Sequence, residues 1–109
     1  MSDKHIIVTT FDNAPKIPID LEARKMFSSP HLEVIQLMLH PGEEMAPHVQ
    51  LMDVVFFILS GRGILELENR IIESTEKSCI FVKAGVQRTW KNSGPGDFSL
   101  LVIKDIKSE

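Results

Sequence analysis

The spacing of short apolar runs constrains the fold of this chain more than any other feature. From Glu33 onward, runs of apolar or β-branched residues recur at intervals of about eight to twelve residues, as in all-β sandwiches and barrels. The expected strands are Glu33 to His40, Asp53 to Leu59, Gly63 to Glu68, Arg70 to Glu73, Cys79 to Lys83, Arg88 to Asn92 and Phe98 to Ile103. Glycine- and proline-rich turns separate them. Because an open sheet leaves unpaired edges, we expect these strands to close into a barrel.

The residues before Glu33 are less regular. Asp20 to Phe27 has apolar spacing that fits a helix capped by Asp20 about as well as a strand, and we favour the extended conformation. The chain of 109 residues has neither repeats nor an obvious linker, so one domain is expected.

Charge and hydropathy exclude two classes of partner. The net charge is −3 and the acidic and basic residues are interspersed, which argues against nucleic-acid binding. No apolar run approaches the ~20 residues that cross a bilayer, and Met1 to His5 lacks the apolar region of a secretory signal. We therefore expect a soluble cytoplasmic protein with no membrane partner. The lone Cys79 cannot form an intrachain disulfide, and its apolar neighbours predict a buried thiol.

Two stretches resemble the paired signature motifs of the cupin family. The Gly, His, His, Glu and Gly positions of the first motif hold Gly42, His48, Gln50, Val54 and Gly61. The Gly, Pro, Gly, His and Asn positions of the second hold Lys77, Lys83, Gly85, Arg88 and Asn92. The resemblance covers about residues 30–105. It implies an all-β cupin double-stranded β-helix, a jelly-roll barrel, within a single domain of residues 1–109 in which residues 1–29 form an extended arm or strands.

The same resemblance defines where a metal would bind. In metal-binding cupins, three histidines and one glutamate converge on a divalent ion. Here His48 remains, Gln50 offers only a neutral amide oxygen, and Arg88 carries a positive charge that repels a cation. We expect no tightly held metal. The alternative is a non-standard site of His48 and Gln50, with His40 as a third ligand, for iron, nickel, manganese or zinc.

Arg88 is the most informative of the candidate site residues. A positive charge inside a barrel needs a partner, because an unpaired buried charge costs about 3–5 kcal/mol. One answer is an anionic ligand, a carboxylate or phosphate, held by Arg88 with His48 and Gln50. The other is structural: Arg88 pairs with Asp53 or a glutamate at the rim, or extends into solvent. The sequence leaves both answers open.

Two aromatic residues complete the candidate ligand site. Trp90 lies two residues after Arg88 and therefore on the same face of the strand, and Phe56 comes from a neighbouring motif strand. An aromatic lining suits a cyclic or apolar ligand. Filling of the barrel by its own side chains is the competing interpretation for both residues.

Alternation along residues 53–59 assigns the faces of that strand. If His48 and Gln50 point into the barrel, the inward set is Val54, Phe56 and Ile58, and the outward set is Val55, Phe57 and Leu59. An outward apolar stripe needs a cover. Either the segment His5 to Phe11 or a second subunit can provide it, and we predict a homodimer.

Three functional hypotheses remain. The first is a small-molecule-binding protein whose barrel takes an anionic ligand without a tightly held metal. The second is an enzyme: a metal-dependent oxygenase or isomerase with a non-standard site, or a metal-free isomerase with His48 as base. The third is a structural dimer with a filled barrel. The fold alone does not decide among them.

Overall fold

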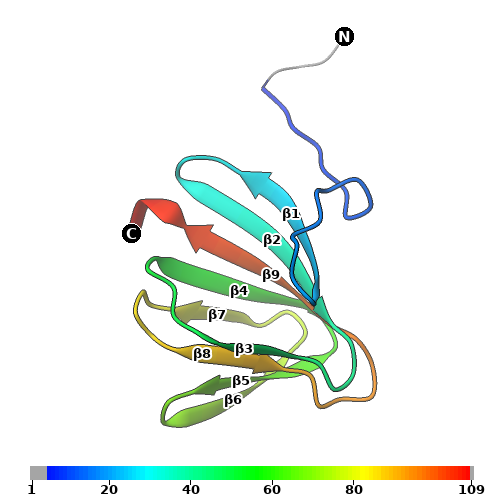
Figure 1. Ribbon diagram of the computed structural model, residues 1–109, viewed down its shortest axis with the longest axis vertical. Helices are drawn as coiled ribbons and strands as arrows, with labels where there is room; N and C mark the ends of the chain where they lie inside the picture. The colour runs from blue at the N-terminus through cyan, green and yellow to red at the C-terminus, as the bar shows by residue number, and fades with distance from the viewer. Residues whose placement is uncertain (1–4, 109) are drawn as a thin grey trace.

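Nine strands form two antiparallel sheets in the computed structural model, which describes residues 5–108. The strands are β1 (Glu22–Ser28), β2 (Leu32–Leu39), β3 (Glu44–His48), β4 (Asp53–Ser60), β5 (Arg62–Leu67), β6 (Arg70–Thr75), β7 (Cys79–Val82), β8 (Arg88–Lys91) and β9 (Phe98–Asp105), followed by a short 3₁₀ helix, Ile106–Ser108. One sheet has the order β1-β2-β9-β4-β7 and the other β3-β8-β5-β6 (Figure 1). The expected all-β double-stranded barrel is confirmed.

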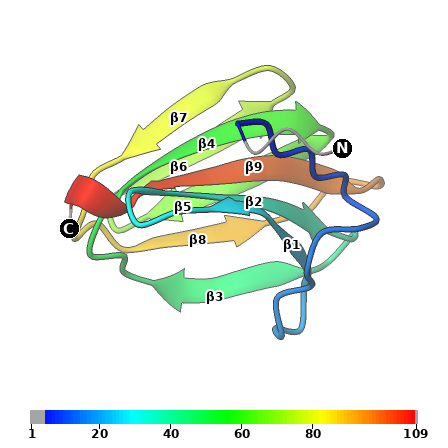
Figure 2. The same ribbon diagram turned by 90° about the horizontal axis from the view of Figure 1, so that it is seen from above.

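The order of strands explains how the barrel holds together. The last strand, β9, lies between β2 and β4, so the two ends of the chain interlock in one sheet. β8 lies between β3 and β5 in the other sheet. Figure 2 shows the two sheets from above, with β3 and β8 on one side of the barrel and β4 and β7 on the other. This arrangement faces the inner side chains of β8 toward those of β2, β4 and β9.

The alternation expected for β4 is confirmed. Val54, Phe56 and Ile58 are buried, whereas the side chains between them are partly exposed on the outer face. The inner core continues through Trp90, whose ring lies 5.3 Å from the rings of both Phe56 and Phe98. Full burial of a large apolar side chain contributes about 1.5–3 kcal/mol, so this inner layer supplies most of the stabilisation.

The extended conformation favoured for Asp20 to Phe27 is confirmed for most of that segment, because Glu22–Ser28 form β1, which pairs with β2 through a bulge between Lys25 and Phe27. One strand, β3, differs from the sequence expectation. β3 has no counterpart among the expected runs because it is short, polar and contains Pro47. Proline cannot donate a ladder hydrogen bond, but β3 is an edge strand and its register shifts between Met45 and His48, which accommodates the proline.

The burial predicted for Cys79 was wrong. The thiol is exposed because Cys79 pairs with Phe57 in the β4–β7 ladder, and Phe57 faces outward. Strand alternation instead buries Val82 on the inner face of β7. The apolar neighbours of Cys79 belong to an edge strand that is covered on one face only.

The N-terminal segment does not cover the outer face. Ile6, Ile7 and Val8 are 63–80% exposed, and Figure 1 shows this segment running away from the sheets. The chain meets the barrel again at Phe11, whose ring lies 5.0 Å from the guanidinium of Arg24. Met1 to Lys4 and Glu109 lie outside the described residues, and so does most of the segment judged for a secretory signal. Among residues 5–108, no helix is long and apolar enough to cross a membrane.

Candidate functional site

A cavity of about 540 Å³ opens between the two sheets. Its wall is built from residues of β1, β2, β3, β4, β8 and β9 and of the segment that precedes β1. The apolar lining residues are Ile17, Ile19, Leu21, Ala23, Ile35, Leu37, Met45, Ala46, Pro47, Val54, Phe56, Trp90 and Val102. The polar ones are Asp20, Glu44, His48, Gln50, Arg88 and Lys104. A mostly apolar pocket of this size with a few converging polar groups is typical of small-molecule sites.

Arg88 is the buried charge of this cavity. Its side chain is 1% exposed, and its Nε donates to the carbonyl of Val86 at 2.9 Å. Among residues 5–108, Nη1 and Nη2 have no hydrogen-bond partner. Burial lowers the pKa of Arg88 because it disfavours the charged form, yet arginine starts so high that the guanidinium stays protonated at neutral pH. The wall of the cavity therefore contains a buried positive charge with two unused donor groups.

The rim partners considered for Arg88 are engaged elsewhere. Asp53 accepts the backbone N–H of Ala84 at 2.9 Å. Glu44 lies 3.9 Å from the ammonium of Lys91. No ion pair to Arg88 is formed within the described part of the chain. The nearest ring is Phe56, whose centroid lies 6.0 Å from the guanidinium carbon.

His48 lies directly opposite Arg88 in the β3–β8 ladder. Its pKa is lowered chiefly by burial. A backbone hydrogen bond has the second-largest effect and opposes this change, whereas the positive charges of Arg88 and Lys104 lower the pKa further. That hydrogen bond joins Nδ1 and the carbonyl of Ala46 at 3.2 Å. Because a carbonyl only accepts, Nδ1 carries the proton and the neutral imidazole keeps its lone pair on Nε2.

The structure brings all five sequence-derived candidates to this one cavity. His48, Gln50, Phe56, Arg88 and Trp90 all line it. Trp90 is fully buried, and its Nε1 is another donor without a hydrogen-bond partner among the described residues.

Sequence reasoning missed two contributions to the cavity. Lys104 lies on the inner face of β9, where its ammonium is 3.5 Å from Glu33. The alternation that places Leu100 and Val102 inward already pointed to it. The second contribution is the wall formed by residues 17–21, for which the irregular N-terminal sequence gave no signal.

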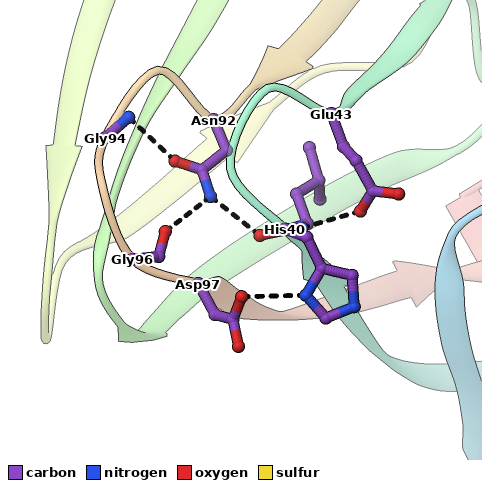
Figure 3. Close-up of polar contacts among 7 residues, drawn as sticks. His40, Glu43, Asn92, Gly94, Gly96 and Asp97 are labelled. Carbon is purple, nitrogen blue, oxygen red and sulfur yellow. Dashed lines mark hydrogen bonds and ion pairs between the residues drawn. The ribbon is translucent and has the colours of Figure 1, made fainter.

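His40 is not among the residues that line the cavity. Figure 3 shows it beside the loop that joins β8 to β9, where Nδ1 lies 2.8 Å from a carboxylate oxygen of Asp97. The hydrogen bond and charge of Asp97 raise the pKa of His40. Its role in this fold is a surface ion pair.

Asn92 shows that the second motif also has a structural part. The side chain is 2% exposed, and its Nδ2 donates to the carbonyls of Leu39 and Gly96, each at 2.8 Å. Its Oδ1 accepts the N–H of Gly94 at 3.0 Å (Figure 3). This one amide joins the end of β2 to the β8–β9 loop.

The residues present do not fit a divalent metal at the position implied by the resemblance. Arg88 occupies one ligand position, and its free nitrogens are donors that repel a cation. Val54 occupies another. Among residues 5–108, no group of three or more His, Cys, Asp or Glu side chains is placed to hold a metal ion.

The two interlocked sheets and the cavity between them define a small double-stranded β-helix protein. The family model described as "Cupin domain" matches residues 36–104, and the chain belongs to this family.

Known proteins agree on the fold and differ in chemistry. The chain is 29% identical over 69 residues to a 5-nitrosalicylic acid 1,2-dioxygenase from Bradyrhizobium sp. The aligned segment covers 63% of this chain but only 33% of that protein. An RmlC-like cupin family protein from Methanocaldococcus jannaschii superposes with a TM-score of 0.79 and 22% identity over 92% of this chain and 90% of its own. A predicted oxalate decarboxylase from Thermotoga maritima superposes with a TM-score of 0.82 and 16% identity, over 91% of this chain and 98% of its own.

Proposed function

We propose that this protein binds a small anionic molecule, a carboxylate or phosphate, inside the barrel without a tightly held metal. The unpartnered, buried guanidinium of Arg88 is the observation that carries the proposal. Leaving a buried charge without its partner costs about 3–5 kcal/mol. A bound anion supplies the missing acceptors, with His48 and Gln50 as further polar contacts.

The names of two similar proteins support the carboxylate form of this ligand. The Bradyrhizobium protein is named for 5-nitrosalicylic acid and the Thermotoga protein for oxalate, and both compounds carry carboxylates. Their reactions are not transferred to this chain, because the first match spans a third of its relative and the second is a likeness of fold.

Replacement of Arg88 by methionine tests the proposal. Wild-type protein should gain thermal stability with benzoate or phosphate but not with chloride at equal ionic strength, since a ligand at about 100 times Kd adds about 2.7 kcal/mol. Arg88→Met should abolish this gain. Without ligand the variant should be at least as stable as wild type, because it removes an unsatisfied buried charge.

Arg70→Met is the matched control, because Arg70 is exposed at the start of β6 and does not line the cavity. This variant should keep the anion-dependent gain. Wild-type protein with no such gain, or Arg88→Met protein that retains it, would remove the support for the proposal. Elemental mass spectrometry of the untagged protein measures the metal content per chain. Near-stoichiometric metal would contradict the proposal that the barrel holds no metal tightly.

A metal-free enzyme is the second candidate, favoured by the state of His48. A neutral imidazole with its lone pair on Nε2 can act as a general base beside a carboxylate held by Arg88. With 2-oxobutyrate as probe, Nε2 would remove a C3 proton to give the enolate, which then takes up a deuteron from D₂O. Exchange followed by NMR should be lost in His48→Gln while the circular dichroism spectrum is unchanged. Exchange that persists in the variant, or none in wild type, rejects this role.

The protein is further proposed to act as a cytoplasmic homodimer. The outer face of the five-stranded sheet carries an apolar stripe formed by Val34, Val55, Phe57, Phe81, Leu101 and Ile103. Phe81 is 60% exposed. A second copy of the chain would remove this surface from water.

A further inference from the structure

We propose that the ligand is a monocarboxylic acid with an apolar body, its carboxylate on Arg88 and its body along the apolar wall of the cavity. This inference rests on the proposed function and narrows it. Three properties of the site support it: the free edge of the guanidinium, the balance of charges around it, and the chemistry of the wall.

The guanidinium has one unpaired edge, which is buried in the wall of the cavity. Nε is already used by the carbonyl of Val86, so the side edge that includes Nε is occupied. Nη1 and Nη2 remain, and together they form a planar pair of parallel donors. The two oxygens of a carboxylate match such a fork in a bidentate contact.

The charges around the fork leave room for one negative charge. Lys104 lies 3.5 Å from Glu33, a carboxylate that it shares with Lys25 at 3.8 Å, and burial lowers the pKa of His48 and so favours its neutral form. Arg88 is thus the single cation of the lining without an acidic partner among the described residues. A dianion would add a second negative charge near Asp20, which also lines the cavity, and would be repelled.

The wall beyond the fork is apolar. Ile35, Leu37, Val54 and Val102 come from three neighbouring strands of one sheet, and Phe56 lies beside Arg88. A small hydrated anion such as free phosphate leaves this wall uncovered. An acid with a hydrocarbon body buries it, and each methylene contributes about 0.8 kcal/mol.

The test uses wild-type protein and a series of probes. Trp90 is the single tryptophan and lines the cavity, so its fluorescence reports on occupancy directly. From butanoate to hexanoate to octanoate, Kd should fall about fourfold per methylene. Octan-1-ol and octylamine have the same body without the carboxylate, and both should bind at least tenfold more weakly than octanoate. Octanedioate and inorganic phosphate should also bind at least tenfold more weakly.

Two variants check the assignment. Arg88→Met should bind octanoate no better than octan-1-ol. Glu33→Gln frees Lys104 from its ion pair and should reduce the preference of octanoate over octanedioate severalfold. Should Arg88→Met fail to fold, the wild-type probe series alone still decides the matter.

The outcomes separate this inference from the proposed function. Phosphate or octanedioate binding more tightly than octanoate, with dependence on Arg88, overturns the monocarboxylate and keeps the anion site. If the affinity does not change with the hydrocarbon length of the acid, the inference that the ligand has an apolar body is overturned. No binding of any anion overturns both proposals.

Discussion

Lys77 carries a local conformational cost at the position where the second cupin motif has glycine. Its φ is +66°, in the left-handed region that side chains with a Cβ rarely adopt. Its backbone N–H still donates to the carbonyl of Ile58 at 2.9 Å, so the turn into β7 requires this conformation. The motif glycine is absent, but its backbone geometry has been retained.

Lys77→Gly is therefore expected to stabilise the protein by about 1 kcal/mol, since glycine adopts this φ without strain. Lys77→Ala, which keeps a Cβ, should give no such gain. Urea denaturation of the three proteins measures the difference. A glycine variant less stable than wild type would show that the Lys77 side chain stabilises the fold by more than its left-handed backbone conformation destabilises it.

The ion pair of His40 makes stability depend on pH. Asp97 raises the pKa of His40 in the folded state above 6.5 by accepting its hydrogen bond and by its charge. The sign follows from linkage: the stabilisation is complete below the unfolded-state pKa and is lost as pH rises through the raised folded-state pKa.

NMR titration of the His40 ring should give a midpoint above 6.5 in wild type and a lower one in Asp97→Asn. The stability difference between the two proteins should be largest below pH 6.5 and should shrink at higher pH. Because the ring is exposed, solvent and salt screen the pair, and added salt should reduce the difference. Equal midpoints in the two proteins would contradict the contact.

The connection between β2 and the β8–β9 loop depends on a single amide. Asn92→Ala would leave the carbonyls of Leu39 and Gly96 without this donor and the N–H of Gly94 without its acceptor. Unsatisfied buried groups cost about 1–3 kcal/mol, so a loss of that size in urea denaturation is expected.

The exposed neighbour provides the control for this connection. Ser93→Ala changes the same loop without touching the buried contacts and should leave stability within about 0.5 kcal/mol of wild type. If both variants lose the same amount, the effect belongs to the loop in general and not to the hydrogen bonds of Asn92.

Strands with regular alternation could be predicted from sequence, and irregular ones could not. β4 was predictable because its apolar residues report both its conformation and its inner face. β3 was not, because an edge strand with a proline and a register shift has no periodic signal. The error at Cys79 has a related cause: apolar neighbours do not reveal that a strand lies at the edge of a sheet.

Strand alternation and motif spacing made part of the candidate site predictable from sequence. They placed His48, Arg88 and Trp90 in one cavity. They did not reveal that Nε of Arg88 is satisfied while the terminal nitrogens are not, which depends on the path of the chain at Val86. The charge balance also depends on the pairing of Lys104 with Glu33, and only the three-dimensional register shows it.

At the scale of the whole molecule, the proposed homodimer would form through the outer face of the five-stranded sheet. Val55 pairs with Ile103 on one side and with Phe81 on the other, so three adjacent strands present apolar side chains on one surface. The N-terminal segment, the other cover considered, leaves Ile6 to Val8 exposed instead. A two-fold axis through this face would bury the stripe of each chain against that of its partner.

Wild type should sediment at twice the mass of one chain at micromolar concentration, and Phe81→Lys should give a monomer, because a charge buried within an apolar interface loses its hydration. Ile71→Lys is the matched control: Ile71 is 66% exposed, compared with 60% for Phe81, but lies on β6 of the other sheet. It should remain dimeric. Unchanged circular dichroism excludes unfolding as the cause. A monomeric wild type, or dissociation by both variants alike, contradicts assembly through this face.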